Sequence, residues 1–151
     1  MLLPESKIET VELMNEEYNL GYVSYDLVSE EYSFKRNEQL KDLELYPAEF
    51  YGLFDKKIRE VPSDVIREFI IDRIIPYNRM NLECYLEYYN LEFWDEWEVF
   101  LAAKGMCFLD TFWIRRNKEE SYKNHIRFTN SVRDDLLTEE YFIKKKFRKI
   151  N

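Results

Sequence analysis

The stretch IETVELMNEEYNLGYVSYDLV, residues 8–28, decides the fold of this chain. Val11 and Leu13 fall on one face of an extended segment, and β-branched and aromatic residues resume after the turn-like NEEYN. A third short extended segment follows around Tyr32. This order of short segments, separated by turn residues, predicts an antiparallel meander of strands over residues 8–36.

From about Pro47 onward, the apolar residues follow a helical spacing instead. The segment VPSDVIREFIIDRIIP, residues 61–76, repeats apolar side chains every three or four positions. Ser63 or Asp64 can cap its first turn, and Pro76 is expected to end it. This segment is therefore the clearest helix in the sequence.

Two further helices are predicted after it. LECYLEYYN, residues 82–90, has one apolar face and Asn81 in position to cap it. FWDEWEVFLAAK, residues 93–104, ends at Gly105, the residue type favoured just past a helix C-terminus. The earlier run PAEFYGLF, which begins at Pro47 and contains Gly52, breaks the strand pattern and leads into the segment 61–76.

Together these patterns predict an α+β fold in which a small N-terminal antiparallel sheet is followed by a cluster of three to four helices. We expect one domain over residues 1–151, because a chain of this length commonly forms a single core. Residues 1–46 are predicted to be mainly strands and residues 47–137 mainly helical. Residues 138–151 are predicted to form a basic terminal helix or tail.

Charge is distributed unevenly along the chain, whose net charge is −8. Residues 1–113 hold 24 acidic and 11 basic side chains, whereas residues 114–151 hold 6 acidic and 11 basic ones. The acidic body repels phosphates and attracts basic surfaces, so we expect no direct binding to nucleic acid. The basic run KKKFRK at 144–149 either contacts an acidic partner or is a solvated helix end.

Composition indicates a folded protein of the cytoplasm. Hydrophobic residues make up 46% of the chain and aromatic residues 17%, which is enough to form a core without disulfides. The two cysteines, Cys84 and Cys107, are too few for a disulfide framework and suit a reducing compartment. We expect no membrane association, because the chain has neither a signal-peptide pattern nor an apolar run of about 20 residues.

Residues with catalytic potential are few, and we expect no enzymatic activity, no cofactor and no metal site. The one histidine, His125, lies in a polar stretch without a nucleophile motif to use it. The three glycines are isolated, so they form no phosphate-binding loop of a known type. Neighbouring carboxylates are expected by chance in a chain with 30 acidic residues.

Asp110 is the one acidic residue in the otherwise apolar and aromatic stretch GMCFLDTFWI, residues 105–114. A partly buried carboxylate is costly unless a donor binds it. Arg73 and Arg79 lie in a similarly apolar neighbourhood, so a guanidinium is expected to pair with either Asp72 or Asp110. Alternatively, Asp110 caps a short helical turn formed by TFWI. Both alternatives make Asp110 structural.

Three segments carry a resemblance to a known family: DRIIPYNRMNLECYLEYYNL (72–91), GMCFLDTFWI and NHIRFTNSV (124–132). They resemble the N-terminal module of HipA-like serine/threonine kinases of Gram-positive bacteria and their mobile elements, over residues 8–137. The residues that match the motifs of that module are Arg73, Ile75, Pro76, Arg79, Asn81, Leu109, Asp110, Phe112 and Trp113. The resemblance implies a regulatory module without the kinase domain, which acts by binding a protein partner such as a HipA-like kinase of a toxin–antitoxin system.

Two functional hypotheses remain open. A HipA-like module would contact its partner through a largely apolar patch that includes Trp94, Trp97 or Trp113. An acidic phage- or plasmid-encoded inhibitor of a basic, nucleic-acid-handling defence enzyme, of the anti-CRISPR or anti-restriction type, would instead imitate phosphates with carboxylates such as Glu30 and Glu31. Salt screens the second kind of contact much more than the first.

Overall fold

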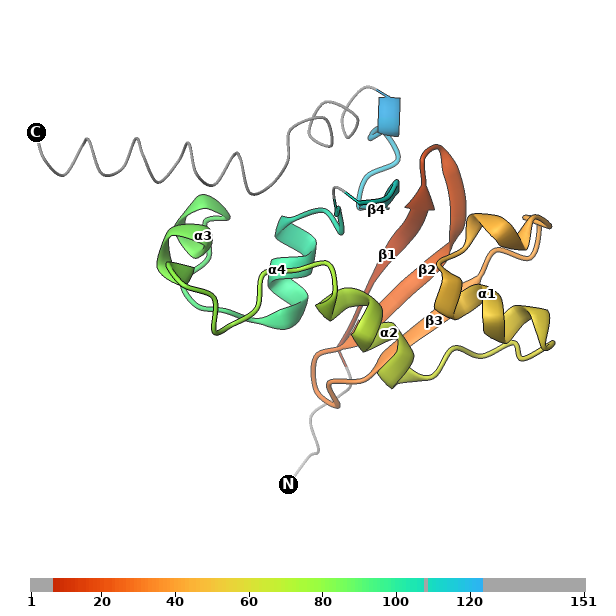
Figure 1. Ribbon diagram of the computed structural model, residues 1–151, viewed down its shortest axis with the longest axis horizontal. Coiled ribbons are helices and arrows are strands. Elements are labelled where there is room, and N and C mark those ends of the chain that lie inside the picture. The colour runs from red at the N-terminus through yellow and green to blue at the C-terminus, as the bar shows by residue number, and fades with distance from the viewer. Residues whose placement is uncertain (1–6, 108, 124–151) are drawn as a thin grey trace, which may run out of the picture.

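The computed structural model describes residues 7–107 and 109–123, and these residues form an α+β fold with one antiparallel sheet (Figure 1). The sheet has four strands in the order β3-β2-β1-β4. Their bounds are β1 Ile8–Asn15, β2 Tyr18–Asp26, β3 Tyr32–Arg36 and β4 Phe112–Arg115. The predicted fold class and the predicted meander over residues 8–36 are therefore confirmed.

The β1–β2 hairpin follows the alternation of its side chains. Val11 pairs with Val23, and the register shifts next to Leu13, at a bulge. On β2, Gly21 has a φ of +146°, and a Cβ there would lie 2.2 Å from the carbonyl oxygen of Lys35. Close approach of β2 and β3 at this point therefore requires glycine.

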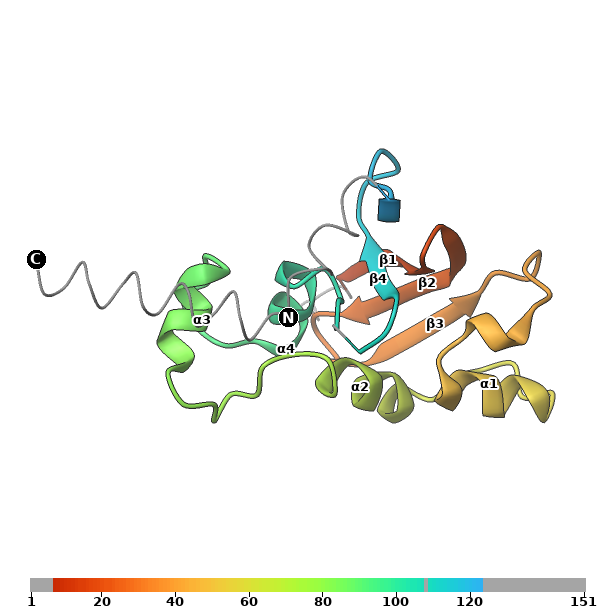
Figure 2. The same ribbon diagram turned by 45° about the horizontal axis from the view of Figure 1, so that its top comes forward.

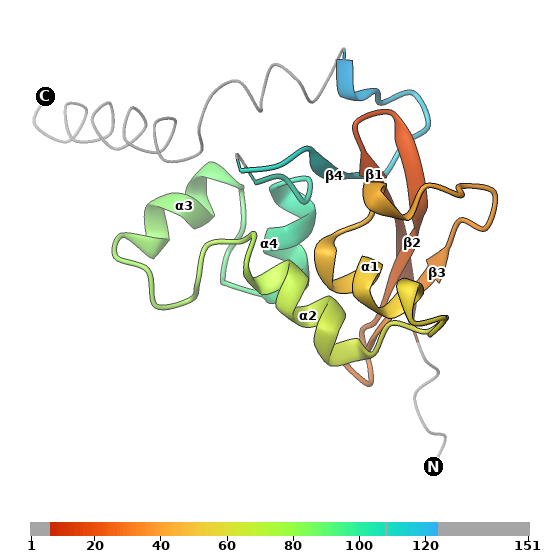
Figure 3. The same ribbon diagram turned by 45° about the vertical axis from the view of Figure 1, so that its right-hand side comes forward.

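Four α-helices and one 3-10 turn complete the described fold. Their bounds are η1 Leu43–Leu45, α1 Ala48–Asp55, α2 Ser63–Ile71, α3 Leu82–Tyr88 and α4 Glu96–Ala102. Figure 2 shows α1, α2 and α4 along one side of the sheet, and Figures 1 and 3 show α3 lying outside this layer. The helices thus cover one sheet face, and α3 is peripheral.

The main core lies between the sheet and the three covering helices. Its apolar side chains come from β1, β2, β3 and β4 on one side and from α1, α2 and α4 on the other. The largest fully buried members of this core are Trp97, Phe50, Phe100, Leu13, Leu20, Ile66, Ile70, Ile114 and Val23. A second cluster, formed by Met14, Met106, Trp113 and Tyr122, packs apart from it. Both faces of the β1–β4 pair are therefore buried.

Helix α1 lies in the run PAEFYGLF, at the start of the region predicted to be mainly helical. Pro47 precedes the first turn, where a missing N–H costs nothing, and Phe50 and Phe54 are buried four residues apart. Gly52 lies within the helix, and burial of the two phenylalanines outweighs its low helix propensity. The proline starts this helix rather than breaking it.

Helix α2 is confirmed, but its ends differ from the prediction. Its first turn follows Pro62, and the Ser63 hydroxyl accepts a hydrogen bond from the backbone N–H of Tyr32 (2.8 Å) instead of capping the helix. The helix ends at Ile71, before Pro76, and Arg73 beyond its end donates from Nε to the carbonyl oxygen of Gly105, after α4.

The helices predicted at 82–90 and 93–104 are present as α3 and α4 but are shorter. Asn81 has a left-handed backbone (φ 62°), and its side chain makes no capping bond. Helix α4 begins only at Glu96, because the Asp95 side chain accepts a hydrogen bond from the backbone N–H of Glu98 and caps the first turn. Trp94 therefore lies outside the helix that contains Trp97.

Strand β4 excludes the alternative in which TFWI forms a short helical turn, and it is a strand within the region 47–137 that was predicted to be mainly helical. Its residues pair with β1, with Leu13 opposite Ile114 and Met14 opposite Trp113. A short apolar run fits a buried strand or a helix equally well until a partner is known, and here β1 supplies the partner.

Several expectations concern residues outside the described part. They are the role of His125, the NHIRFTNSV segment at 124–132 and the basic helix or tail at 138–151. Within residues 7–107 and 109–123, the helices are too short and too polar for any of them to cross a membrane.

Candidate functional site

Arg73 is the centre of a buried polar cluster between α2 and the segment that leads into β4. Its Nη1 and Nη2 atoms donate to the two carboxylate oxygens of Asp110 at 2.7 and 2.6 Å. Its Nε donates to the carbonyl oxygen of Gly105 (2.7 Å), and Nη2 also reaches that of Phe112 (3.1 Å). The side chain is only 5% exposed, so these bonds replace the water that the guanidinium loses.

Asp110 is a structural acid, as the sequence indicates. Its Oδ1 atom accepts a second hydrogen bond, from the backbone N–H of Phe112 (3.1 Å), at the first residue of β4. The ion pair predicted for Asp72 or Asp110 is thus formed by Asp110 with Arg73. Asp110 ties the start of β4 to the end of α2 and does not cap a helical turn.

A hollow of about 250 Å³ lies beside this cluster. It is bordered by the segment after α2, by α3 and by the segment before Asp110. Arg79 is on its border, with its guanidinium carbon 4.9 Å from the ring centre of Tyr85. The residues that line it are Asp72, Arg73, Ile74, Ile75, Pro76, Arg79, Tyr85, Tyr89, Cys107 and Leu109.

Trp94 holds the segment after α2 in place. Its indole Nε1 donates to the carbonyl oxygen of Ile75 (2.9 Å), and its ring lies edge-on to Tyr77, with the ring centres 5.9 Å apart. The indole is half-buried. Trp94 therefore supports the border of the hollow from the α3–α4 connection.

Large apolar side chains are strongly exposed at Leu109, which lines this hollow, and in the segments before and after α3. In the described part of the chain, the four most exposed large apolar side chains are Met80 (83%), Leu109 (79%), Phe93 (70%) and Tyr77 (69%). Leu109 lines the hollow, Met80 follows Arg79 on its border, and Tyr77 contacts Trp94, the neighbour of Phe93. We call these four residues the α3 surface. Exposed apolar groups gathered in one region are typical of interaction sites.

Trp97 and Trp113 are wrong as candidates for partner contact. Both are 0% exposed. Trp97 stacks on Tyr25, with the ring centres 5.3 Å apart, and its Nε1 has no hydrogen-bond partner among the described residues. Trp113 belongs to the second cluster and donates to the carbonyl oxygen of Glu16 (2.7 Å). The sheet buries both rings, so they stabilise the fold.

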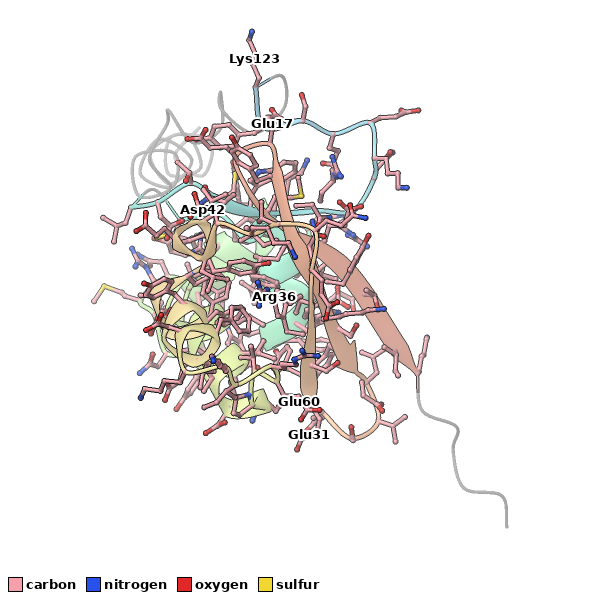
Figure 4. All side chains as sticks on the ribbon, turned by 90° about the vertical axis from the view of Figure 1, so that its right-hand side faces the viewer. Glu17, Glu31, Arg36, Asp42, Glu60 and Lys123 are labelled. Atoms are coloured by element: carbon pink, nitrogen blue, oxygen red, sulfur yellow. The ribbon has the colours of Figure 1, made fainter. Side chains whose placement is uncertain are left out.

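Glu30 and Glu31 lie in the β2–β3 turn, which Figure 1 shows away from α3, and Figure 4 shows Glu31 at this turn. Both side chains are exposed. The backbone holds the turn, since the N–H of Glu30 donates to the carbonyl oxygen of Asp26 (2.8 Å) and Arg67 Nη2 donates to that of Glu30 (2.9 Å). The two carboxylates are therefore displayed to solvent from an ordered turn.

A second polar cluster, formed by Tyr32, Arg67 and Glu96, links β3, α2 and α4. The Tyr32 hydroxyl donates to Glu96 Oε2 (2.6 Å), and Arg67 Nε lies 3.2 Å from the same oxygen. Burial raises the pKa of Tyr32, and its bond to Glu96 raises that pKa further. Burial alone would lower the pKa of Arg67, but Glu96 raises it overall. Both groups therefore stay protonated at neutral pH, and the cluster is a structural link.

The structure thus brings together four predicted site residues, Arg73, Arg79, Asp110 and Trp94, around one hollow. The exposed Tyr77, Met80 and Phe93 were missed, because they lie in irregular segments where no periodic pattern marks a face. Within residues 7–107 and 109–123, no group of three or more His, Cys, Asp or Glu side chains could hold a metal ion.

Comparison of the chain with protein-family models, with curated proteins and with solved structures finds no match. The resemblance to HipA-like kinases therefore rests on the motif residues alone.

Proposed function

We propose that this protein is a non-catalytic regulatory protein that binds a protein partner through the α3 surface. The observation that supports this function is the exposure of Leu109, which lines the hollow, together with that of Tyr77, Met80 and Phe93 in the segments that flank α3. Transfer of such side chains from water to a protein interface is favourable, at about 25 cal/mol per Å² of apolar area.

The proposed partner is a HipA-like kinase of a toxin–antitoxin system. Five of the motif residues that carry the resemblance line the hollow: Arg73, Ile75, Pro76, Arg79 and Leu109. Asp110, a sixth, holds Arg73 in place. Six of the nine motif residues therefore belong to one hollow and its support, and this arrangement supports a shared binding function.

Binding to a HipA-like kinase tests this function. In a titration with the purified kinase, Met80→Lys combined with Leu109→Lys should weaken binding by at least about 2 kcal/mol, because two charges would enter an apolar contact. The matched control is Ile8→Lys with Val28→Lys, which adds the same charge at exposed apolar positions in β1 and the β2–β3 turn. Equal affinity of wild type and the Met80/Leu109 variant would refute the surface, and no binding by wild type would refute the partner.

The alternative function is inhibition of a basic nucleic-acid-handling enzyme by phosphate mimicry. It is favoured by the ordered β2–β3 turn, which displays Glu30 and Glu31 to solvent. Carboxylates on such a turn can enter a basic groove without ordering the backbone on binding. Reversal of both charges, Glu30→Lys with Glu31→Lys, tests this alternative and should abolish binding to a basic groove. The variant leaves the α3 surface unchanged, so binding through that surface should persist.

A further inference from the structure

Strand β3 forms one edge of the described sheet. It is the last strand in the order β3-β2-β1-β4, so only one of its two sides pairs with another described strand. Figure 4 looks onto this side of the molecule and labels Arg36 at β3. A hollow of about 900 Å³ lies here, and we call it the β3 groove. Its lining residues are Asn19, Tyr22, Phe34, Lys35, Arg36, Asn37, Glu38, Gln39, Lys41 and Arg59.

The β3 groove passes around the edge of the sheet and does not belong to one face. Lys35 lies opposite the 42% exposed Tyr22 in the β2–β3 ladder, and both project from the face that the helices leave open. Arg36 projects from the other face, where its guanidinium carbon lies 5.0 Å from the ring centre of Phe54 in α1. Because residues of both faces line one hollow, that hollow includes the edge between them.

The hydrogen bonds of the β2–β3 ladder show which backbone groups of β3 point outward. Just outside the two ends of β3, the carbonyl oxygen of Glu31 accepts a hydrogen bond from β2, and the N–H of Asn37 donates one to it. In an antiparallel ladder, every second residue bonds to the neighbouring strand and the residues between them face away from it. The outward-facing residues of β3 are therefore Tyr32, Phe34 and Arg36.

Two of these three outward-facing residues offer backbone groups for a further strand. The N–H of Tyr32 donates to the Ser63 hydroxyl (2.8 Å), so the start of α2 covers that end of the edge. The N–H and carbonyl groups of Phe34 and Arg36 face away from β2 and make no hydrogen bond to another described residue. Each of the two residues thus presents one donor and one acceptor, which is the pattern that an added β-strand binds.

Side chains around this edge are basic, although the net charge of the protein is −8. Lys35 and Arg36 lie on the two faces of β3 itself, and Lys41 and Arg59 line the groove from the two neighbouring connections. Glu38 supplies the single carboxylate of the lining. The ion pairs of the described residues involve none of these four cations. An added strand also projects its side chains to both faces, so carboxylates on either face would meet a cation.

We propose that the β3 groove binds an extended acidic segment of a partner protein, which joins the sheet beside β3 as a further strand. Its backbone would pair with Phe34 and Arg36. Its carboxylates would face Lys35 on the open face, and Arg36 and Arg59 on the helix-covered face. A second copy of this chain is a poor occupant, because pairing of β3 with another β3 would bring like charges together. The β3 groove is separate from the α3 surface, so this proposal goes beyond the proposed function.

Titration of the full-length protein with three blocked octapeptides at low salt tests the proposal. The first peptide alternates pairs of glutamates with single valines, and we expect it to bind with one peptide per chain. The second has lysine in place of glutamate and should not bind. The third is the glutamate peptide with its four central amides N-methylated, which keeps the carboxylates but removes the N–H groups that a strand needs. It should bind about tenfold or more weakly, and equal binding would show charge attraction without an added strand.

Variants of the protein test the position of the site. Lys35→Gln with Arg59→Gln should weaken binding of the glutamate peptide by about tenfold or more. The matched control is Lys7→Gln with Lys118→Gln, which removes the same charge from exposed lysines outside the groove. This control should bind within about twofold of wild type, and equal weakening in the two double variants would overturn the site.

Amide hydrogen exchange followed by NMR tests the added strand directly. The glutamate peptide should slow exchange at Phe34 and Arg36, and should change it little at Ser33 and Lys35, whose backbone already bonds to β2. Absence of glutamate-peptide binding, or binding without slower exchange at Phe34 and Arg36, would overturn the proposal. A dimer of the free protein with this exchange pattern would overturn it in favour of a second copy. The α3 surface is unchanged in all these variants, so failure here leaves the proposed function untouched.

Discussion

Arg73 and Asp110 form a two-pronged ion pair across 37 positions of the chain, with nitrogen–oxygen distances of 2.7 and 2.6 Å. The guanidinium is buried and the carboxylate is 31% exposed. Because Arg73 follows α2 and Asp110 precedes β4, the pair fixes the helix layer to the edge of the sheet. The same pair supports the hollow at α3.

Loss of this pair should destabilise the protein strongly. Asp110→Ala leaves the buried guanidinium of Arg73 without its carboxylate, and we expect the free energy of unfolding to fall by about 2–4 kcal/mol. Urea denaturation followed by tryptophan fluorescence measures this change. Asp72→Ala is the matched control and should cost under about 0.5 kcal/mol, because Asp72 is exposed. Wild-type stability of Asp110→Ala would contradict the structural role.

The two buried tryptophans should respond differently to the same substitution. Both are fully buried, but the indole N–H of Trp113 is bonded to Glu16, whereas that of Trp97 has no partner among the described residues. Trp113→Phe should therefore cost about 1 kcal/mol more than Trp97→Phe, because only the first loses a hydrogen bond. Thermal unfolding of the two variants gives this difference. A larger loss for Trp97→Phe would show that its N–H is satisfied.

Two glycines should give opposite results when they are replaced by alanine. Gly21→Ala places a Cβ 2.2 Å from the Lys35 carbonyl oxygen, so we expect a loss of about 3 kcal/mol or more. Gly52 lies inside α1 with no atom within 4 Å of the added Cβ. Gly52→Ala should therefore raise stability by about 0.5–1 kcal/mol. Thermal midpoints that move in the same direction would contradict this view of the β2–β3 contact.

Stability should fall in acid partly through Glu120. Burial alone would raise the pKa of Glu120, but hydrogen bonds from Lys104 and from the backbone N–H groups of Arg116 and Asn117 lower it overall, below 4.5. The stabilisation is therefore present above pH 4.5 and is lost as the pH falls through the lowered pKa.

Glu120→Gln removes this contribution. At pH 7 the variant should lose about 1 kcal/mol or less, because Lys104 is 45% exposed and water screens the pair. The difference from wild type should shrink as the pH falls through the lowered pKa of Glu120. Denaturant titrations at several pH values measure it, with the exposed Glu119→Gln as control. A difference that stays constant down to the pH at which the protein unfolds would show that titration of Glu120 plays no part.

Salt dependence should separate the two functional hypotheses. Binding through the apolar α3 surface should change little between about 50 and 300 mM salt and should be unaffected by Glu30→Lys with Glu31→Lys. Binding by phosphate mimicry should weaken steeply over the same range and fail on charge reversal. Titration of a captured partner at several salt concentrations measures both. A steep response that tolerates Met80→Lys would refute the α3 proposal.

The sequence by itself determined the elements whose signal lies within a few neighbouring residues. The alternation of Val11 and Leu13 indicates a strand, and the repeat from Val65 to Ile70 indicates a helix, because burial of one face imposes a period of two or of about 3.6 residues. The sequence also showed that Asp110 needs a donor, since an isolated acid in an apolar run is otherwise too costly.

Only the tertiary structure decided which distant groups meet. The run at 111–114 becomes a strand because the free edge of β1 lies beside it, and no local pattern contains that edge. Asp110 could have paired with either arginine on sequence grounds, and the path of the chain after α2 selects Arg73. The strand partner of β4 and the ion-pair partner of Asp110 depend on packing between segments tens of residues apart. The periodicity of apolar residues indicates only whether one segment buries a face.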